Sequence, residues 1–527
     1  MDNLDIINLV VDFLSEKERA RLALTSKLFF TLVMPMAWRT VLGATQLFKL
    51  LPGMKVELPR GAIGTETLYL PPKLQCVSFK RFRYYAKFVK HLYLFKSPTI
   101  VHQINKWSDL LDYTSQNTLL PSLVSITLNT YWPESVSHFA WIAVFCSPSV
   151  RHIEAQTLVR RNIPMVPNQT TSGILKILIN RCPNLEFLSI FVDPKLRPSS
   201  LEPGLLKDES ECAALFFDSN KSIRNLACTS AMAGHCHKTL SLSSRLPQLR
   251  SLQMYSTGQG EDIAPDIPLE TGGFPTLAEL HLFDFLPSAT LSIWTSVSAL
   301  ARLTHVELEI DHSTHDQDQV IHAFYNMKLI PAICTRAPNI TDLSIRPIID
   351  GDSYLQIDIT TLELLSALPL QSLTCARSCI GHQSGEPPAA VLAPLFPMIK
   401  ILRWPDLTIT YTELHQLASM QHLKHLSVGL DFESFSDSSP LDSAKAIPQD
   451  YLWKLRVLES DFSKIDFLSP AKVRMFLSRI KELWPHLIDF RQNLPFDYPQ
   501  CDSAANERVS VLNEMFKEIL SNFQPSI

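Results

Sequence analysis

The chain has 527 residues, of which 46% are hydrophobic and 19% are charged, and this balance excludes a largely disordered protein. Its formal net charge of −4 gives no electrostatic reason to expect a surface for nucleic acid or anionic membrane. The N-terminus lacks the basic region of a secretory signal, and no apolar stretch approaches the roughly 20 residues of a membrane span, so we expect a soluble cytosolic or nuclear protein.

The first forty residues carry the pattern of a small helical bundle. Apolar residues recur every four positions from Ile6 to Leu14, as they would along one face of a helix. The stretch Ser15–Glu18 has the spacing of a capping box and predicts a second helix that continues to Phe30. A short third helix is expected from there until Pro35 breaks the run.

This segment resembles an F-box. The family pattern opens with a helix of Ile-Leu-x-x-Ile-x-x-x-Leu type, continues from an acidic residue through Leu-x-x-x-(Cys/Ser)-Lys-x-(Trp/Phe), and ends in Leu-Trp-Arg. The matching positions here are Ile6, Ile7, Val10, Leu14, Glu18, Leu22, Ser26, Lys27, Phe29, Ala37, Trp38 and Arg39. The Leu-Pro pair that opens the family pattern would fall at Asp2 and Asn3, so either the first helix is clipped or its adaptor contacts are weaker.

The resemblance implies docking onto a Skp-type adaptor, which links an F-box protein to a cullin–RING ubiquitin ligase. Three short helices expose more apolar surface than they can bury, which suits a segment completed by a partner. The residues expected to face the adaptor are Leu4, Ile7, Val11, Leu14 and Leu22. The alternative is that the same residues only pack an N-terminal cap on the domain that follows.

One short phrase recurs along the chain from residue 89 to residue 492. It consists of Pro or a polar residue, one more residue, and then apolar-x-x-apolar-x-apolar, with clear copies at 183–190, 247–254 and 275–282. The last three residues of the phrase alternate apolar-polar-apolar, as in a strand with one buried face. Segments of helical spacing precede several copies. Repeated head to tail, helix, loop and strand should stack into a parallel sheet whose neighbouring repeats bury one another's apolar faces.

The phrase resembles a leucine-rich repeat with irregular spacing. Successive copies lie from 24 residues apart (Ile399 to Leu423) to 38 residues apart (Leu185 to Ile223), whereas the usual period is about 20–29. Such long, irregular repeats resemble those of fungal and animal F-box proteins. The alternative is that the phrase only reflects the buried strands of an ordinary sheet.

The predicted fold is therefore an α/β solenoid. It comprises an N-terminal three-helix F-box (1–42), a connector (43–62), a leucine-rich-repeat-like horseshoe with parallel strands and outer helices (63–500), and a C-terminal capping helix (501–527). Since terminal repeats need covering, a cap is the expected role of the last segment.

The resemblance implies that a target protein binds the concave strand face, towards which the side chains between the apolar strand positions point. The residues expected to contact it are Phe191, Tyr255, Phe283, Glu309, Arg346 and Arg403. The aromatic members would form an anchor patch flanked by charge, the composition of an interface hot spot. The alternative is that each is an ordinary solvated residue of the sheet.

The sequence carries no recognisable catalytic or metal-binding constellation. Cys228, His235, Cys236 and His237 lack the paired spacing of a tetrahedral metal site. Asp318, which follows two histidines, is expected to start a helix rather than to bind a ligand. We therefore expect no metal, no cofactor and no active site, and the ten irregularly spaced cysteines fit free thiols in a reducing compartment.

These observations predict a substrate-recognition subunit of a Skp–cullin–F-box ubiquitin ligase, in which the F-box docks the adaptor and the repeats bind a target protein. The first alternative is a leucine-rich-repeat interaction scaffold not coupled to ubiquitination. The second is an enzyme with a site in a long loop, which interacting titratable groups in a cleft would favour.

Overall fold

The structure is a computed structural model that describes residues 7–493 with gaps, and Glu514 and Lys517 beyond them. The longest gaps are residues 130–136, 157–164, 196–208, 259–272, 432–453 and 462–474. The chain divides into two compact units, unit 1 (Met1–Glu261 and Leu269–Thr276) and unit 2 (Asp262–Pro268 and Leu277–Ile527). Within the described residues, no helix is long and apolar enough to cross a membrane.

The N-terminal bundle of unit 1 consists of helical residues between 7 and 13, followed by α2 (Glu16–Ala23) and α3 (Lys27–Ala37). The predicted capping box is present, because the Ser15 amide donates to the Glu18 carboxylate at 2.8 Å and the Ser15 hydroxyl accepts from the Glu18 amide at 3.4 Å. The second helix therefore begins where its sequence signal places it.

The boundaries of the second and third helices differ from the prediction. The second helix ends at Ala23 instead of continuing to Phe30, because Thr25 donates its hydroxyl to the Leu22 carbonyl and Ser26 accepts from the Phe29 amide as a new N-cap. Pro35 does not break the third helix, which continues two residues further. The helix tolerates this proline close to its end, where few hydrogen bonds remain to be lost.

Unit 1 is built on a parallel sheet whose strands follow chain order. Its strands are, in spatial order, β1 (Thr40–Leu42), β4 (His91–Tyr93), β6 (Ser125–Asn129), β7 (His152–Gln156), β9 (Phe187–Asp193), β10 (Asn225–Thr229) and β11 (Ser251–Tyr255). The connecting helices are α4 (Ala44–Phe48), α5 (Lys80–Ala86), α6 (Trp107–Gln116), α7 (Ser137–Phe145), α8 (Asn168–Arg181), α9 (Glu209–Ser219) and α10 (Cys236–Ser243). A smaller sheet comprises β2 (Lys55–Glu57), β3 (Gly64–Tyr69) and β5 (Ile100–Asn105), and β8 (Met165–Pro167) pairs with β9.

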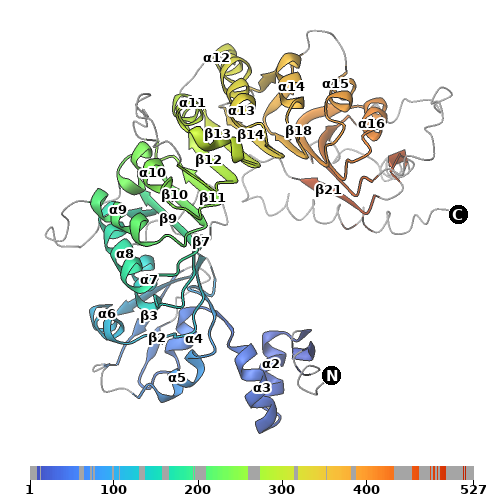
Figure 1. The fold of residues 1–527 in the computed structure, drawn as a ribbon. Helices are drawn as coiled ribbons and strands as arrows, with labels where there is room; N and C mark the ends of the chain where they lie inside the picture. The colour runs from blue at the N-terminus through green and yellow to red at the C-terminus, as the bar shows by residue number, and fades with distance from the viewer. Residues whose placement is uncertain are drawn as a thin grey trace. The chain divides into compact units, whose positions relative to one another are not determined.

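Unit 2 repeats this plan, and in Figure 1 its helices lie along one side of its strands. The parallel strands are β12 (Glu279–Phe285), β13 (His305–Asp311), β14 (Asp342–Ile348), β16 (Ser372–Cys375), β18 (Ile401–Ile409), β19 (His425–Leu430), β20 (Val457–Asp461) and β21 (Asp489–Asn493). The helices between them are α11 (Pro287–Ser296), α12 (Asp318–Ala323), α13 (Ile330–Arg336), α14 (Ile359–Ser366), α15 (Pro388–Leu395) and α16 (Tyr411–Ala418). A separate pair of strands, β15 (Leu355–Ile357) and β17 (Ser378–Ile380), completes the unit.

The recurring phrase sets the register of these sheets. Leu226 of β10 pairs with Leu188 of β9 and Leu252 of β11, so equivalent apolar positions of successive repeats stack directly. All three are buried, and the core of each unit runs as a continuous ladder behind its sheet. The predicted α/β solenoid is thereby confirmed, although the unit 1 sheet already begins at β1, ahead of the predicted repeat start at residue 63.

Candidate protein-interaction surfaces

The N-terminal bundle has a well-defined interior. Its buried core consists of Val11, Ala23, Val33 and Met34, and the side chains packed against this core include Ile7, Leu22, Phe29, Phe30, Met36, Trp38 and Tyr85. Tyr85 belongs to α5 of the repeats, and its ring lies 4.6 Å from that of Trp38. The bundle is therefore anchored to the first repeat through aromatic packing.

Most of the residues predicted to face an adaptor lie on the inner side of this bundle. Val11 is fully buried, which contradicts its placement on a docking surface. Ile7 and Leu22 are half-buried against the core, Leu14 is also half-buried, and Leu4 lies outside the described residues. The first helix has apolar residues on both faces, so spacing alone could not tell the inner face from the outer one.

The outer side of the bundle carries a second group of large apolar side chains, which the sequence reasoning missed as a group. This outer apolar set comprises Leu9, Val10, Phe13, Leu24 and Leu28. Phe13 is 83% exposed and Leu24 is 79% exposed, so most of the Phe13 ring and most of the Leu24 side chain contact water. Burying such surface releases about 25 cal/mol per Å², which makes the set a candidate for partner binding.

The aromatic anchor patch predicted on the strand face does not exist as an exposed surface. Phe191, Tyr255 and Phe283 are all buried, and the rings of Phe191 and Tyr255 pack edge to face with centroids 5.2 Å apart. The residues from Leu188 to Val192 are buried without alternation, which shows that both faces of β9 are covered here. The prediction was wrong because a strand's own pattern does not reveal what covers its second face.

The strand face of unit 2 is polar. One register row crosses its strands at about 4.8 Å per step, and it contains His281, Glu307, Ser344, Thr374, Arg403, Ser427 and Glu459. His281 Nδ1 lies 3.2 Å from Glu307 Oε2, and His425 Nε2 lies 3.0 Å from Glu459 Oε2. This face therefore carries histidine–carboxylate pairs rather than an apolar groove.

Of the charged residues predicted to contact a target, two are already paired with each other. Arg346 Nη1 lies 3.2 Å from Glu309 Oε2, and their side chains are only 15% and 10% exposed. Arg403 is exposed, and within the described part of the chain its side chain makes no hydrogen bond or ion pair. Among the six predicted contact residues, Arg403 is thus the one that the structure presents to a partner.

Among the described residues, no three His, Cys, Asp or Glu side chains come together as a metal site. In the cluster of Cys228, His235, Cys236 and His237, burial raises the pKa of the Cys228 thiol to about 12, and Cys236 is buried as well. His312 is buried, with Nε2 lying 3.2 Å from the Tyr325 hydroxyl, and Asp318 begins α12 as predicted. These side chains serve packing and helix initiation in the structure.

A histidine in the unit 1 sheet makes stability depend on pH. Burial lowers the pKa of His91, and the nearby charges of Arg39, Lys90 and His152 lower it further. Because the unfolded chain takes up a proton more readily, the neutral His91 contributes stability above its ordinary pKa of 6.5, and this contribution is lost as the pH falls from there through the lowered pKa of the folded state. We expect His91→Gln to flatten the fall in stability between pH 7.5 and pH 5.5, measured by urea unfolding. An unchanged slope would rule out His91 as a source of this dependence.

No protein-family model and no curated protein matches the sequence. Among solved structures, the chain is similar to the Rad7 and Elc1 complex in yeast, with 12% identity and a TM-score of 0.32, covering 63% of this chain and 82% of that chain. It is also similar to the leucine-rich repeat-containing protein LegL7 from Legionella pneumophila, with 12% identity and a TM-score of 0.26, covering 79% of this chain and 96% of that chain.

Proposed function

We propose that the chain is the substrate-recognition subunit of a Skp–cullin–F-box ubiquitin ligase. The observation that carries this proposal is the outer apolar set on a bundle whose sequence resembles an F-box. Residues such as Phe13, Leu24 and Leu28 stand exposed although the described part of the bundle has a buried core of its own. A partner that covers them explains why such side chains are placed outside.

In this role the repeats hold a target protein, and the polar strand face of unit 2 suits that task. It offers the partly exposed His281–Glu307 pair and the exposed guanidinium of Arg403. Such a surface favours specificity through charge complementarity. The chain would contribute no catalytic residue, act in the cytoplasm or nucleus, and accelerate ubiquitin transfer by bringing the target close to the ligase.

The proposal is tested by pulldown of the full chain with a purified Skp-type adaptor, followed by addition of the cullin–RING subunits. Saturable binding to the adaptor, and its retention when the cullin joins, supports the proposal. Failure of the intact chain to bind any Skp-type adaptor overturns it.

A leucine-rich-repeat scaffold is the second candidate, and one observation favours it. The bundle packs on the first repeat through Trp38 and Tyr85, as a terminal cap would. A scaffold would bind protein partners through its repeats and would not engage the adaptor. The same pulldown therefore separates the two functions.

A further inference from the structure

The charge of the chain is unevenly distributed, which the overall composition hides. No Asp or Glu occurs between Glu66 and Asp109, a stretch that contains the cations Lys73, Lys80, Arg81, Arg83, Lys87, Lys90, Lys96 and Lys106. Those eight leave 48 − 8 = 40 basic residues against 52 acidic ones in the rest of the chain, a net charge of −12 there. The net charge of the whole chain therefore conceals a basic stretch in this part of unit 1.

Helix α5 concentrates these charges on its surface. Lys80, Arg81, Arg83 and Lys87 of the helix are exposed, while Phe82 and Ala86 face the core. In the described part of the chain, the side chains of Lys80, Arg81 and Arg83 make no ion pair or hydrogen bond. Their charges are thus available to an incoming anion.

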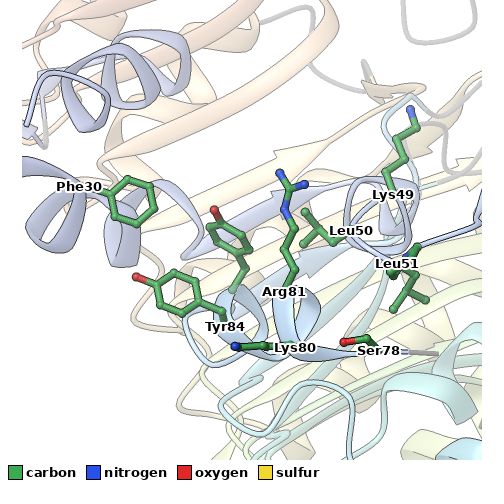
Figure 2. A pocket seen from close by; sticks show the side chains of 10 residues that line it. Phe30, Lys49, Leu50, Leu51, Ser78, Lys80, Arg81 and Tyr84 are labelled. Carbon is green, nitrogen blue, oxygen red and sulfur yellow. The ribbon is translucent and has the colours of Figure 1, made fainter. Parts of the chain in front are cut away.

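Beside these cations lies an open pocket of about 750 Å³, shown in Figure 2. Its apolar and aromatic lining comes from Phe30 of α3, from Leu50, Leu51 and Pro52 after α4, and from Tyr84 and Tyr85 of α5. Lys49, Lys80 and Arg81 also line it, and Figure 2 shows Arg81 between the aromatic and the leucine side chains. The size is that of a pocket that accepts a ligand or anchoring side chains.

The aromatic side of the pocket is preformed. The rings of Phe30 and Tyr84 stack with centroids 6.3 Å apart, and Tyr84 meets Tyr85 edge to face at 5.1 Å. Lys87 Nζ lies 4.9 Å from the centroid of the Tyr84 ring, which holds that side chain in place by a cation–π contact. Because little ordering remains to be done on binding, more of the contact energy is retained.

We propose that this α5 pocket binds an acidic segment of a partner protein, with an apolar or aromatic side chain inserted between Phe30, Tyr84 and the leucines. Carboxylates on either side of that anchor would meet Lys49, Lys80 and Arg81. An anchor in an apolar pocket surrounded by complementary charge is the usual anatomy of a protein–protein hot spot.

A peptide fits the site better than a nucleic acid does. The pocket is partly aliphatic, whereas a single strand needs successive exposed rings on which to stack its bases. A short acidic segment feels mainly the nearby cations, because the Debye length is about 8 Å at physiological ionic strength.

The probe is a short fluorescein-labelled peptide with one central phenylalanine flanked by aspartates and glutamates, titrated with the full chain by fluorescence anisotropy. We expect saturable binding that weakens as salt is raised. The double variant Lys80→Glu with Arg81→Glu should lower the affinity by about tenfold or more, since like charges then oppose each other. The control, Lys328→Glu with Arg336→Glu on exposed positions of unit 2, should leave it unchanged.

Further variants separate the contribution of the apolar anchor from that of the charges. Tyr84→Ala, or serine in place of the phenylalanine of the peptide, should weaken binding at unchanged charge, and Lys80→Gln with Arg81→Gln should weaken it without adding repulsion. If the variant Lys80→Glu with Arg81→Glu binds the peptide as tightly as the control variant of unit 2 does, the proposal is overturned. So does tighter binding of a single-stranded oligonucleotide or an anionic vesicle than of the peptide.

The proposal is independent of adaptor docking. A Phe13→Asp variant should still bind the peptide, because Phe13 does not line the α5 pocket. If the chain binds the peptide but not the adaptor, only the proposed ligase function is overturned.

Discussion

Phe13→Asp combined with Leu28→Asp is expected to abolish capture of a Skp-type adaptor while the chain stays folded. Both side chains are exposed and lie outside the core of the bundle. Fully burying one such side chain releases about 1.5–3 kcal/mol, so removing two costs roughly 3–6 kcal/mol of binding, a factor of a hundred or more in Kd. Titration calorimetry with the purified adaptor measures the loss, and circular dichroism reports the fold.

The matched control is Val11→Asp, which acts on the same helix from the inside. Val11 is fully buried against Ala23 and Val33, so a carboxylate there should unfold the bundle rather than only block a partner. Adaptor binding would then be lost together with part of the helical circular dichroism signal. If the Phe13 and Leu28 variant binds as tightly as the intact chain, the outer apolar set is not the docking surface.

The sequence predicts the repeats well because their signal is local and redundant. Leu188, Leu226 and Leu252 each occupy the same place in the phrase, and each is buried in the same ladder. The capping box at Ser15 is predicted for the same reason, since all its atoms lie within one helical turn.

The surfaces are predicted poorly because they depend on what covers each side chain. Val11 and Phe13 are neighbours in one helix, yet one is buried and the other is 83% exposed. The sequence predicts an exposed Phe191, but both faces of its strand β9 are covered in the fold. The basic stretch around α5 can be read directly from the sequence, but a net charge summed over the whole chain conceals it.

The Glu309–Arg346 pair supplies the second large effect, and it concerns the stability of unit 2. Arg346→Met should destabilise the unit by about 3–5 kcal/mol, because it removes the Arg346 guanidinium from the buried Glu309 carboxylate. The double variant Glu309→Leu with Arg346→Met should recover most of this loss, since neither charge of the pair is then left in the interior. Hydrogen exchange of the β13 and β14 amides measures both.

An exposed pair with nearly the same geometry provides the comparison. Arg151 Nη1 lies 3.1 Å from Glu186 Oε1 in unit 1, but these side chains are 61% and 34% exposed. Arg151→Met should therefore cost less than about 1 kcal/mol, because water solvates the remaining carboxylate. If both variants cost the same, burial does not govern the Glu309–Arg346 pair, and its two charges would return as candidates for target binding. If they differ as expected, the pair is part of the framework, and recognition on this face rests on exposed groups such as Arg403.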